Sequence, residues 1–208
     1  MADTNGLIEQ LEKVREEARA LVESRWQEFE TLRKTGNEEE LFAELSFCVL
    51  TANWSAQGGM KAQKIIGKGF ANLPKDELTK MHVDVGHRYP QVRAEYIVSN
   101  RWIISQLRTL IEEPDPREFF VKNVKGLGWK ESSHFLRNVA FRDYAILDKH
   151  MLRVMLQYEL IDEIPKGWTK KKYLDYEERL KNVAEGFGEC LGKLDLYLWY
   201  MIKHTVDK

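Results

Sequence analysis

The sequence predicts an all-α protein, and three patterns support this fold class. Apolar residues recur at three- and four-residue steps along nearly the whole chain, as they do on the buried face of a helix. Hardly any stretch shows the two-residue alternation of a half-buried strand. Glycine and proline interrupt the helical pattern where helices should end. The 208 residues suit one domain or two small halves that share a core.

The first predicted helix runs from Leu7 to Phe29, with its apolar residues at helical spacing. Thr35-Gly36-Asn37 ends this stretch, and a strongly apolar helix is predicted over residues 38–51. The later predicted helices span residues 61–70, 76–81, 91–110, 116–123, 130–140, 149–160, 170–185 and 191–205. The breakers between them are Gly58-Gly59, Pro74, Pro90, Pro114-Asp115-Pro116, Gly126/Gly128, Pro165-Lys166-Gly167 and Gly186/Gly188.

The composition excludes several classes of protein. With 43% hydrophobic and 31% charged residues, the chain is neither disordered nor a membrane protein. No apolar run approaches the roughly 18 residues of a membrane span, and the first residues lack a signal-peptide core. Cys48 and Cys190 are too few for a disulfide framework, a four-thiolate zinc site or an iron–sulfur cluster. We therefore expect a cytoplasmic protein.

The charge is spread unevenly, although the net charge is only −1. Residues 1–45 hold six basic and twelve acidic side chains, whereas residues 60–110 hold nine basic and four acidic ones. Residues 117–153 hold eight basic and four acidic side chains. Phosphate binding requires a local basic surface rather than a basic protein, so the last two segments are candidates for contact with nucleic acid. Ordinary fluctuation of surface charge is the alternative interpretation.

Residues 117–153 also carry the clearest chemical pattern. A predicted helix leads into Val124-Lys125-Gly126-Leu127-Gly128, and the next helix begins near Lys130. Two glycines in a short helix–helix turn allow close approach of another molecule. The N–H groups of the turn and of the following helix start can then hold an anion such as a DNA phosphate. A glycine-rich hairpin without such a use has the same pattern.

Lys130 and Asp148 each lie at the start of a predicted helix, and both are candidates for catalysis. The helix dipole disfavours a cation in the first turn, and a lysine that is more readily neutral can act as a nucleophile. Asp148 lies where a carboxylate caps a helix and stays ionised through the amides it accepts. Such a carboxylate can stabilise positive charge or accept a proton. A surface lysine and an ordinary N-cap are the alternatives.

Six segments of the sequence form one pattern. Lys130 ends the hairpin segment Gly126-Leu127-Gly128-Trp129-Lys130, and Asp148 follows eighteen residues later within Leu147-Asp148-Lys149-His150. The other segments are ELSFCVLTANW (44–54), GHRY (86–89), SHFLRN (133–138) and DLYLWY (195–200). At these positions they resemble the archaeal-type 8-oxoguanine DNA glycosylase/AP lyases of the helix-hairpin-helix DNA glycosylase superfamily. Together these segments extend over most of the chain.

The resemblance implies a bifunctional repair enzyme that acts as a monomer, without a cofactor, on double-stranded DNA containing oxidised guanine. The damaged nucleotide is flipped out of the duplex, and Lys130 attacks C1′ of its deoxyribose and displaces the base. Asp148 stabilises the oxocarbenium-like sugar and assists proton transfer. The resulting Schiff base then permits β-elimination, which cuts the strand on the 3′ side of the lesion.

The resemblance implies base recognition by Tyr89, Trp199 and Lys208, through stacking and cation–π attraction. Core packing is the alternative for Trp199, because Leu198 and Ile202 share its helical spacing. The residues implied in DNA contact are Lys125, Gly126, Gly128, His134 and Arg137. A structural monovalent cation is implied at the backbone carbonyls of Lys122, Val124 and Leu127, with no catalytic metal. His87 and Arg88 are secondary candidates, as are His134 and Arg137. The two histidines lack the spacing of paired metal ligands, so we expect core or phosphate hydrogen bonds from them.

Some positions depart from the family's pattern. Lys125 stands where many members have proline, and Tyr89 stands where this branch often has phenylalanine. The loop over residues 141–144 lacks a glycine–proline character. Two other functions stay open: a non-catalytic hairpin module that grips DNA phosphates, and the same chemistry on another oxidised base or on abasic sites.

For the architecture, we expect two helical subdomains with a helix-hairpin-helix motif and a cleft between them. The first subdomain would comprise residues 1–60 and 186–208, and the second would comprise residues 61–185.

Overall fold

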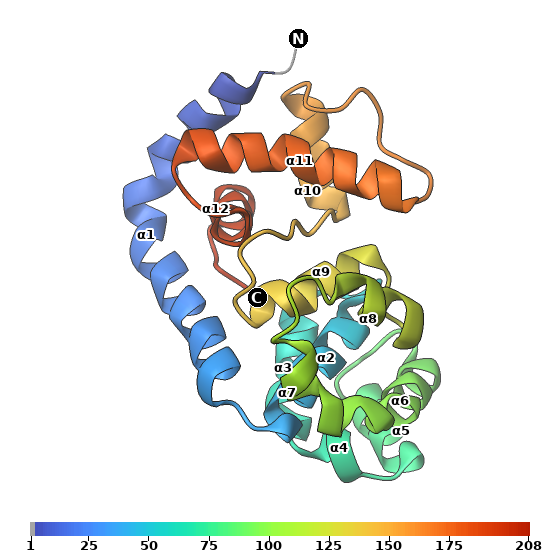
Figure 1. The fold of residues 1–208 in the computed structure, drawn as a ribbon. Coiled ribbons are helices and arrows are strands. Elements are labelled where there is room, and N and C mark those ends of the chain that lie inside the picture. The colour runs from blue at the N-terminus through green and yellow to red at the C-terminus, as the bar shows by residue number, and fades with distance from the viewer. Residues whose placement is uncertain (1–2) are drawn as a thin grey trace. The chain divides into compact units, whose positions relative to one another are not determined.

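The computed structural model describes residues 3–208, and this part of the chain contains helices and no strand (Figure 1). The predicted all-α fold class is confirmed. The helices are α1 (Thr4–Thr35), α2 (Glu38–Thr51), α3 (Ala56–Ile66), α4 (Gly69–Asn72), α5 (Lys75–Asp84), α6 (Pro90–Ser99), the 3-10 helix η1 (Arg101–Gln106), α7 (Leu107–Leu110), α8 (Arg117–Asn123), α9 (Trp129–Asn138), α10 (Lys149–Gln157), α11 (Lys170–Phe187) and α12 (Leu191–Lys203). None of the helices in residues 3–208 combines the length and apolarity that crossing a bilayer requires.

One predicted breaker was wrong, because Gly58-Gly59 lies inside α3 instead of before it. α3 begins after Ser55, whose hydroxyl caps the helix by accepting the N–H of Gly58 at 3.1 Å. A Cβ at Gly59 would lie 2.8 Å from both Phe47 and Thr51 of α2. Glycine is therefore needed for close packing of the two helices, and this tertiary reason outweighs its low helix propensity.

The chain forms two compact units. Unit 1 comprises residues 3–28 and 140–208, with the first part of α1 and α10 to α12. Unit 2 comprises residues 29–139, with the end of α1 and all helices from α2 to α9. The expected subdomain boundaries at residues 60 and 186 fall inside α3 and α11. Functional subdomains with those boundaries stay a prediction, of which residues 1 and 2 lie outside the described residues.

α2 is the central helix of unit 2 (Figure 1). It contacts α3, α4, α6, α7, η1 and α9, and every residue from Leu41 to Thr51 is buried. Such a helix must be apolar nearly all round. Its one buried carboxylate, Glu44, accepts hydrogen bonds from Gln63 of α3 and Asn138 of α9. The polar group is thereby satisfied, and it joins α2 to both neighbours.

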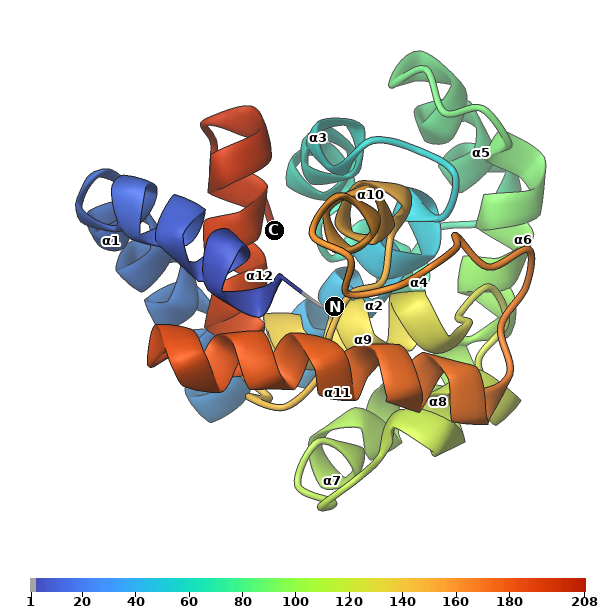
Figure 2. The same cartoon turned by 90° about the horizontal axis from the view of Figure 1, so that it is seen from above.

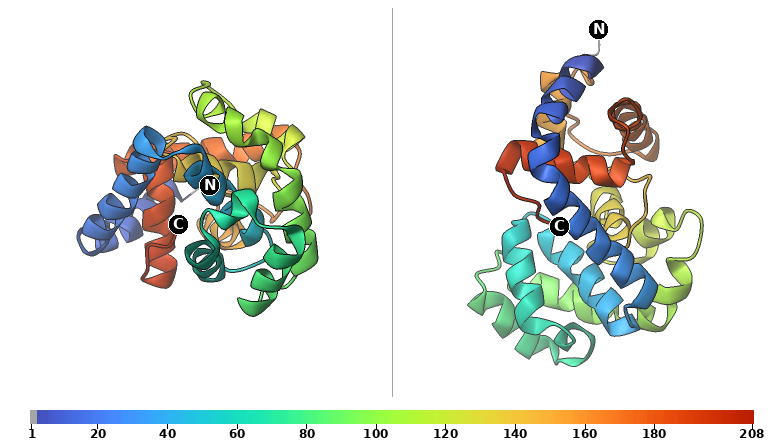
Figure 3. Two further views of the ribbon diagram at one scale, coloured as in Figure 1. Left: turned by 90° about the horizontal axis from the view of Figure 1, so that it is seen from below. Right: turned by 90° about the vertical axis from the view of Figure 1, so that its left-hand side faces the viewer.

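In unit 1, α12 lies next to the first part of α1 and crosses it (Figures 2 and 3). The two helices and α11 share an apolar core, which the helical spacing on α1 predicted. Its fully or nearly fully buried members include Leu7, Leu11, Ala18, Val22 and Trp26 of α1, Val183 and Phe187 of α11, and Leu194 and Leu198 of α12.

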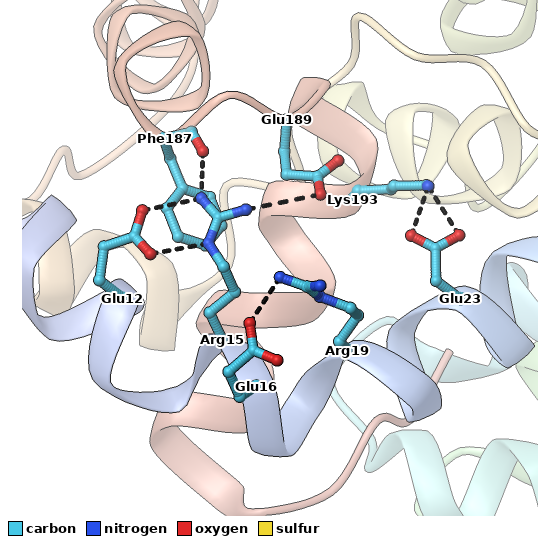
Figure 4. Close-up of polar contacts among 8 residues, drawn as sticks. All are labelled: Glu12, Arg15, Glu16, Arg19, Glu23, Phe187, Glu189 and Lys193. Carbon is cyan, nitrogen blue, oxygen red and sulfur yellow. Dashed lines mark hydrogen bonds and ion pairs between the residues drawn. The ribbon is translucent and has the colours of Figure 1, made fainter.

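Charged side chains tie the connection between α11 and α12 to α1 (Figure 4). The Arg15 guanidinium lies 3.7 Å from the ring centroid of Phe187 and pairs with Glu12 at 2.8 Å. It also donates to the carbonyl oxygen of Phe187 at the end of α11. Lys193 of α12 pairs with Glu23 of α1 at 2.7 Å. These contacts hold the start of α12 in place on α1.

His82 of α5 is fully buried in unit 2, and its Nδ1 lies 3.3 Å from the carbonyl oxygen of Pro90. Burial lowers the pKa of this imidazole to about 4 from an ordinary value of 6.5; the Pro90 contact opposes this shift, and His87 adds to it. The unfolded chain therefore binds a proton more readily than the folded one between these values. Proton binding at this position therefore does not reduce the free energy of unfolding well above pH 6.5. It reduces this free energy progressively as the pH falls from 6.5 towards 4.

We expect this group to lower the free energy of unfolding by about 3 kcal/mol between neutral pH and about pH 4. His82→Asn keeps a donor for the Pro90 carbonyl but cannot titrate, so its decline should be smaller by about that amount. Urea denaturation of both proteins at several pH values measures the difference. Equal declines in the two proteins would contradict this account of His82.

Candidate functional site

The predicted hairpin connects α8 and α9 in unit 2. Gly126 has a φ of +85°, in the left-handed region that glycine adopts without strain. A Cβ at this position would lie 2.8 Å from the ring of Tyr96 and 3.3 Å from Val49. Glycine is thus required by close packing of the hairpin on α6 and α2, which the sequence pattern alone did not indicate.

A buried asparagine that sequence reasoning missed holds the hairpin from α6. The Asn100 side chain is fully buried, and its Nδ2 donates to the Lys125 carbonyl oxygen at 2.8 Å. The Lys125 N–H in turn donates to Asn100 Oδ1 at 2.9 Å. The helix predicted over residues 91–110 is interrupted here and continues as η1 and α7. An asparagine inside a predicted helix, where its propensity is low, was the available signal.

Lys130 lies in the first turn of α9, as the sequence predicted. Its side chain is 23% exposed, and Nζ lies 3.0 Å from Glu131 Oε1. The other carboxylate oxygen accepts the N–H of Gly128, the N-cap of α9, at 3.2 Å. A glutamate three residues after an N-cap has the capping-box spacing, which could have identified Glu131. Its charge offsets the unfavourable helix dipole, so the ammonium has a partner in the free protein.

Tyr89 is the N-cap of α6, and its ring is directed to the surface with 41% of the residue exposed. The Arg88 guanidinium lies 5.5 Å from the centroid of this ring. His87 is buried, and it makes hydrogen bonds to the Leu50 carbonyl and the Tyr89 N–H. The expectation of core hydrogen bonds for His87 is confirmed.

His134 and Arg137 of α9 are buried, at 7% and 2% exposed. The His134 ring meets Phe47 edge-on with a centroid distance of 5.4 Å, and the Arg137 guanidinium lies 5.0 Å from the ring centroid of Phe29. Both side chains therefore have packing roles inside unit 2. Contact of these two residues with DNA stays a prediction. The side chain of Lys125, by contrast, is exposed.

Asp148 caps α10 in unit 1, as predicted. Its Oδ1 accepts the N–H groups of His150 and Met151, each at 2.8 Å, and the residue is half-buried. His150 meets the Trp199 ring edge-on at a centroid distance of 5.5 Å. Burial lowers the pKa of His150, while Asp148 acts in the opposite direction. The first turn of α10 thus holds both the Asp148 carboxylate and the His150 ring that contacts Trp199.

Trp199 is half-buried, whereas the neighbouring Leu198 is fully buried. Its indole N–H points to Asp207 Oδ2 at 3.4 Å, and Arg25 Nε donates to the Val206 carbonyl at 3.3 Å. These contacts hold the segment after α12 against unit 1, and Lys208 in this segment is half-buried.

The structure therefore gathers the predicted residues in two sets. Unit 2 holds Tyr89, Lys125, Gly126, Gly128, Lys130, His134 and Arg137, and unit 1 holds Asp148, Trp199 and Lys208. Lys130 and Asp148 belong to different units. Within residues 3–208, no group of three histidine, cysteine or acidic side chains is arranged to hold a metal ion.

Comparisons with known proteins indicate one family. A family model described as 8-oxoguanine DNA glycosylase matches residues 22–189. A relative from Thermotoga maritima, named 8-oxoguanine DNA glycosylase/AP lyase, is 60% identical over 205 residues, which are 97% of this chain and 99% of the relative.

Solved structures agree over nearly the full length. The crystal structure of the Thermotoga maritima 8-oxoguanine DNA glycosylase has a TM-score of 0.96 at 59% identity, and the match covers 99% of this chain and 100% of that one. Methanocaldococcus jannaschii 8-oxoguanine glycosylase/lyase, in complex with a 15mer DNA containing 8-oxoguanine, has a TM-score of 0.93 at 42% identity. That match covers 97% of this chain and 99% of the other.

Proposed function

Because this chain belongs to the 8-oxoguanine DNA glycosylase family, we propose that it excises 8-oxoguanine from double-stranded DNA and then cuts the strand as an AP lyase. The observation that carries the proposal is the half-buried amine of Lys130, which lies in the first turn of α9, directly after the hairpin. A non-catalytic module that only binds DNA phosphates would need the hairpin but not this amine. We propose that the chain acts as a monomer.

The reaction begins when the damaged nucleotide leaves the base stack, at a cost of a few kcal/mol. The neutral amine of Lys130 forms a bond to C1′, and the bond between C1′ and the base breaks with its electron pair on the base. Ring opening of the sugar gives a protonated imine between Lys130 and C1′. This imine draws electrons from C2′, which loses a proton, and the C3′–O bond breaks on the 3′ side. Hydrolysis of the imine then releases Lys130.

Two carboxylates have roles in these reaction steps. Glu131 lies within hydrogen-bonding reach of the Lys130 ammonium, so it can accept the proton that the lysine must lose before attack. Asp148 stabilises the positive charge that develops on the sugar and assists proton transfer to the departing base. The two amides on its Oδ1 restrict the orientation of the carboxylate, which reduces the reorganisation needed in the transition state.

Recognition of the base is assigned to Tyr89, Trp199 and Lys208. The exposed face of Tyr89 and the half-buried Trp199 offer the aromatic surfaces on which a purine can stack. Lys208 supplies a cation that helps to distinguish 8-oxoguanine from guanine. Stacking does not require the hydroxyl group of Tyr89. This hydroxyl can instead affect which oxidised purine is preferred.

We assign the hairpin to contact with the phosphate backbone of DNA. Gly126 and Gly128 bring the turn's N–H groups towards a phosphate, and the exposed Lys125 adds a charge, with His134 and Arg137 as further contacts. The carbonyl oxygens of Lys122, Val124 and Leu127 are hard donors that fit a monovalent cation. Such an ion would be structural, and it would neutralise charge next to the phosphate.

A panel of duplexes tests this function. The duplexes carry 8-oxoguanine, another oxidised purine, guanine or an abasic site, and base release and strand cutting are measured separately. We expect base release from 8-oxoguanine but not from guanine, and strand cutting at both 8-oxoguanine and abasic sites. Binding without release from any duplex would favour a non-catalytic module. Faster release of the other oxidised purine would reassign the substrate.

A further inference from the structure

We propose that His87 is a positioning residue for base recognition, and that its imidazole holds Tyr89 in the orientation that stacks on the flipped-out base. The inference rests on the proposed function, since that function assigns the stacking role to Tyr89. Tyr89 itself is exposed, whereas His87, two residues before it, is only 5% exposed. The backbone that carries the exposed ring is thus bound by a buried group two residues away.

His87 joins the end of α2 to the start of α6. Its Nε2 lies 3.0 Å from the carbonyl oxygen of Leu50, one of the last carbonyls of α2, which have no partner within the helix. Its Nδ1 lies 2.9 Å from the N–H of Tyr89, the N-cap of α6. The imidazole thereby connects Tyr89 to the central helix of unit 2.

The two partners determine the protonation of the ring. A peptide N–H can only donate, so Nδ1 must offer a lone pair to Tyr89, and a carbonyl oxygen can only accept, so Nε2 must carry the proton. His87 is therefore neutral, in a single tautomer. Burial lowers its pKa, and Arg93 lowers it further, while the Leu50 hydrogen bond opposes these effects. Neutrality at physiological pH agrees with the hydrogen-bond geometry.

The surroundings leave His87 little freedom to move. The Trp54 ring packs against it at a centroid distance of 4.4 Å, and the His82 ring lies 5.9 Å away. Arg93 donates to the carbonyl oxygen of Ala52, the C-cap of α2, at 2.7 Å. Side chains from α6 and the preceding loop thus close the end of α2 together, with His87 as the member that also binds the Tyr89 backbone.

Two variants of similar shape test the two hydrogen bonds of the His87 imidazole separately. His87→Gln places a donor near the position of Nε2 and can keep the Leu50 bond, but it lacks the acceptor for Tyr89. His87→Asn places an oxygen near the position of Nδ1 and can keep the Tyr89 bond, but it lacks the Leu50 bond. We expect His87→Gln to lower the single-turnover excision of 8-oxoguanine about tenfold, and His87→Asn about threefold or less.

Strand cutting at abasic DNA shows whether His87→Gln affects the position of Tyr89 or the fold in general. Abasic DNA has no base to stack, so strand cutting at an abasic site should change less than about twofold in His87→Gln. Tyr89→Ala should lower excision of 8-oxoguanine at least about tenfold, and adding His87→Gln to it should cause no further loss. Such non-additivity is the signature of a residue that acts through Tyr89.

The outcomes distinguish this inference from the function on which it rests. Equal loss on abasic and 8-oxoguanine DNA, additive loss in the double variant, or full excision by His87→Gln would overturn the role of His87. Unchanged excision by Tyr89→Ala would overturn the stacking role of Tyr89 and, with it, this inference. Absence of excision by the wild-type protein would overturn the proposed function.

Discussion

Lys130→Gln is expected to abolish the covalent intermediate and to lower both base excision and strand cutting about 10³-fold or more. Glutamine keeps much of the length of lysine, and its side-chain oxygen and nitrogen can still make hydrogen bonds, but the amide nitrogen is no nucleophile. Borohydride reduction of a reaction mixture measures the intermediate, since it converts the imine to a stable amine that joins protein and DNA. Single-turnover assays on 8-oxoguanine and abasic duplexes measure the two rates.

Lys171→Gln is the matched control, because Lys171 also lies in the first turn of a helix, α11, and is exposed. It should be trapped on DNA as efficiently as the wild-type protein. Trapping of Lys130→Gln at the wild-type level would show that another amine reacts. Equal loss in both variants would show that the substitutions act through charge rather than through a nucleophile.

Asp148→Asn is expected to lower base excision about 10²- to 10⁴-fold while the affinity for 8-oxoguanine DNA changes less than about threefold. The asparagine oxygen can still accept the amides of His150 and Met151, so the cap of α10 is retained and only the charge is lost. Single-turnover excision and fluorescence anisotropy of labelled DNA measure the two effects.

Asp148→Ser extends the test, because serine also caps helices but places no charge at this position. Both variants should keep the wild-type melting temperature within a few degrees and lose excision to a similar extent. Loss of DNA binding and of thermal stability along with excision would instead make Asp148 a structural cap, without a direct role in the reaction.

Local patterns predicted the features of this protein that depend on local physics. The all-α class, the hairpin before α9, the place of Lys130 in a first turn and the cap by Asp148 all follow from spacing over a few residues. Such features are determined by neighbours in the sequence. Tertiary contacts modify them little here, so the predictions for these elements agree with the structure.

The features that the sequence did not predict depend on contacts between distant residues. The Asn100 side chain pairs with the backbone of Lys125, and Gly59 lies in a helix because α2 is so close. Core hydrogen bonds were one expectation for His87, but its partner, a carbonyl 37 residues away, was not predicted. Asn100 and His87 satisfy backbone groups of distant partners, and Gly59 leaves space for the side chains of Phe47 and Thr51. Patterns over a few residues contain none of these partners. Glu131 is the exception, since its capping-box spacing was readable.

The proposed reaction requires a bond between the Lys130 amine and C1′ of the damaged nucleotide. Mass spectrometry of the borohydride-reduced complex, after digestion of both protein and DNA, locates this bond. We expect one modified peptide, which contains Lys130 and carries the reduced sugar remnant on that side chain. An adduct on a different amine, or an active enzyme that yields no adduct after reduction, would contradict the proposed reaction.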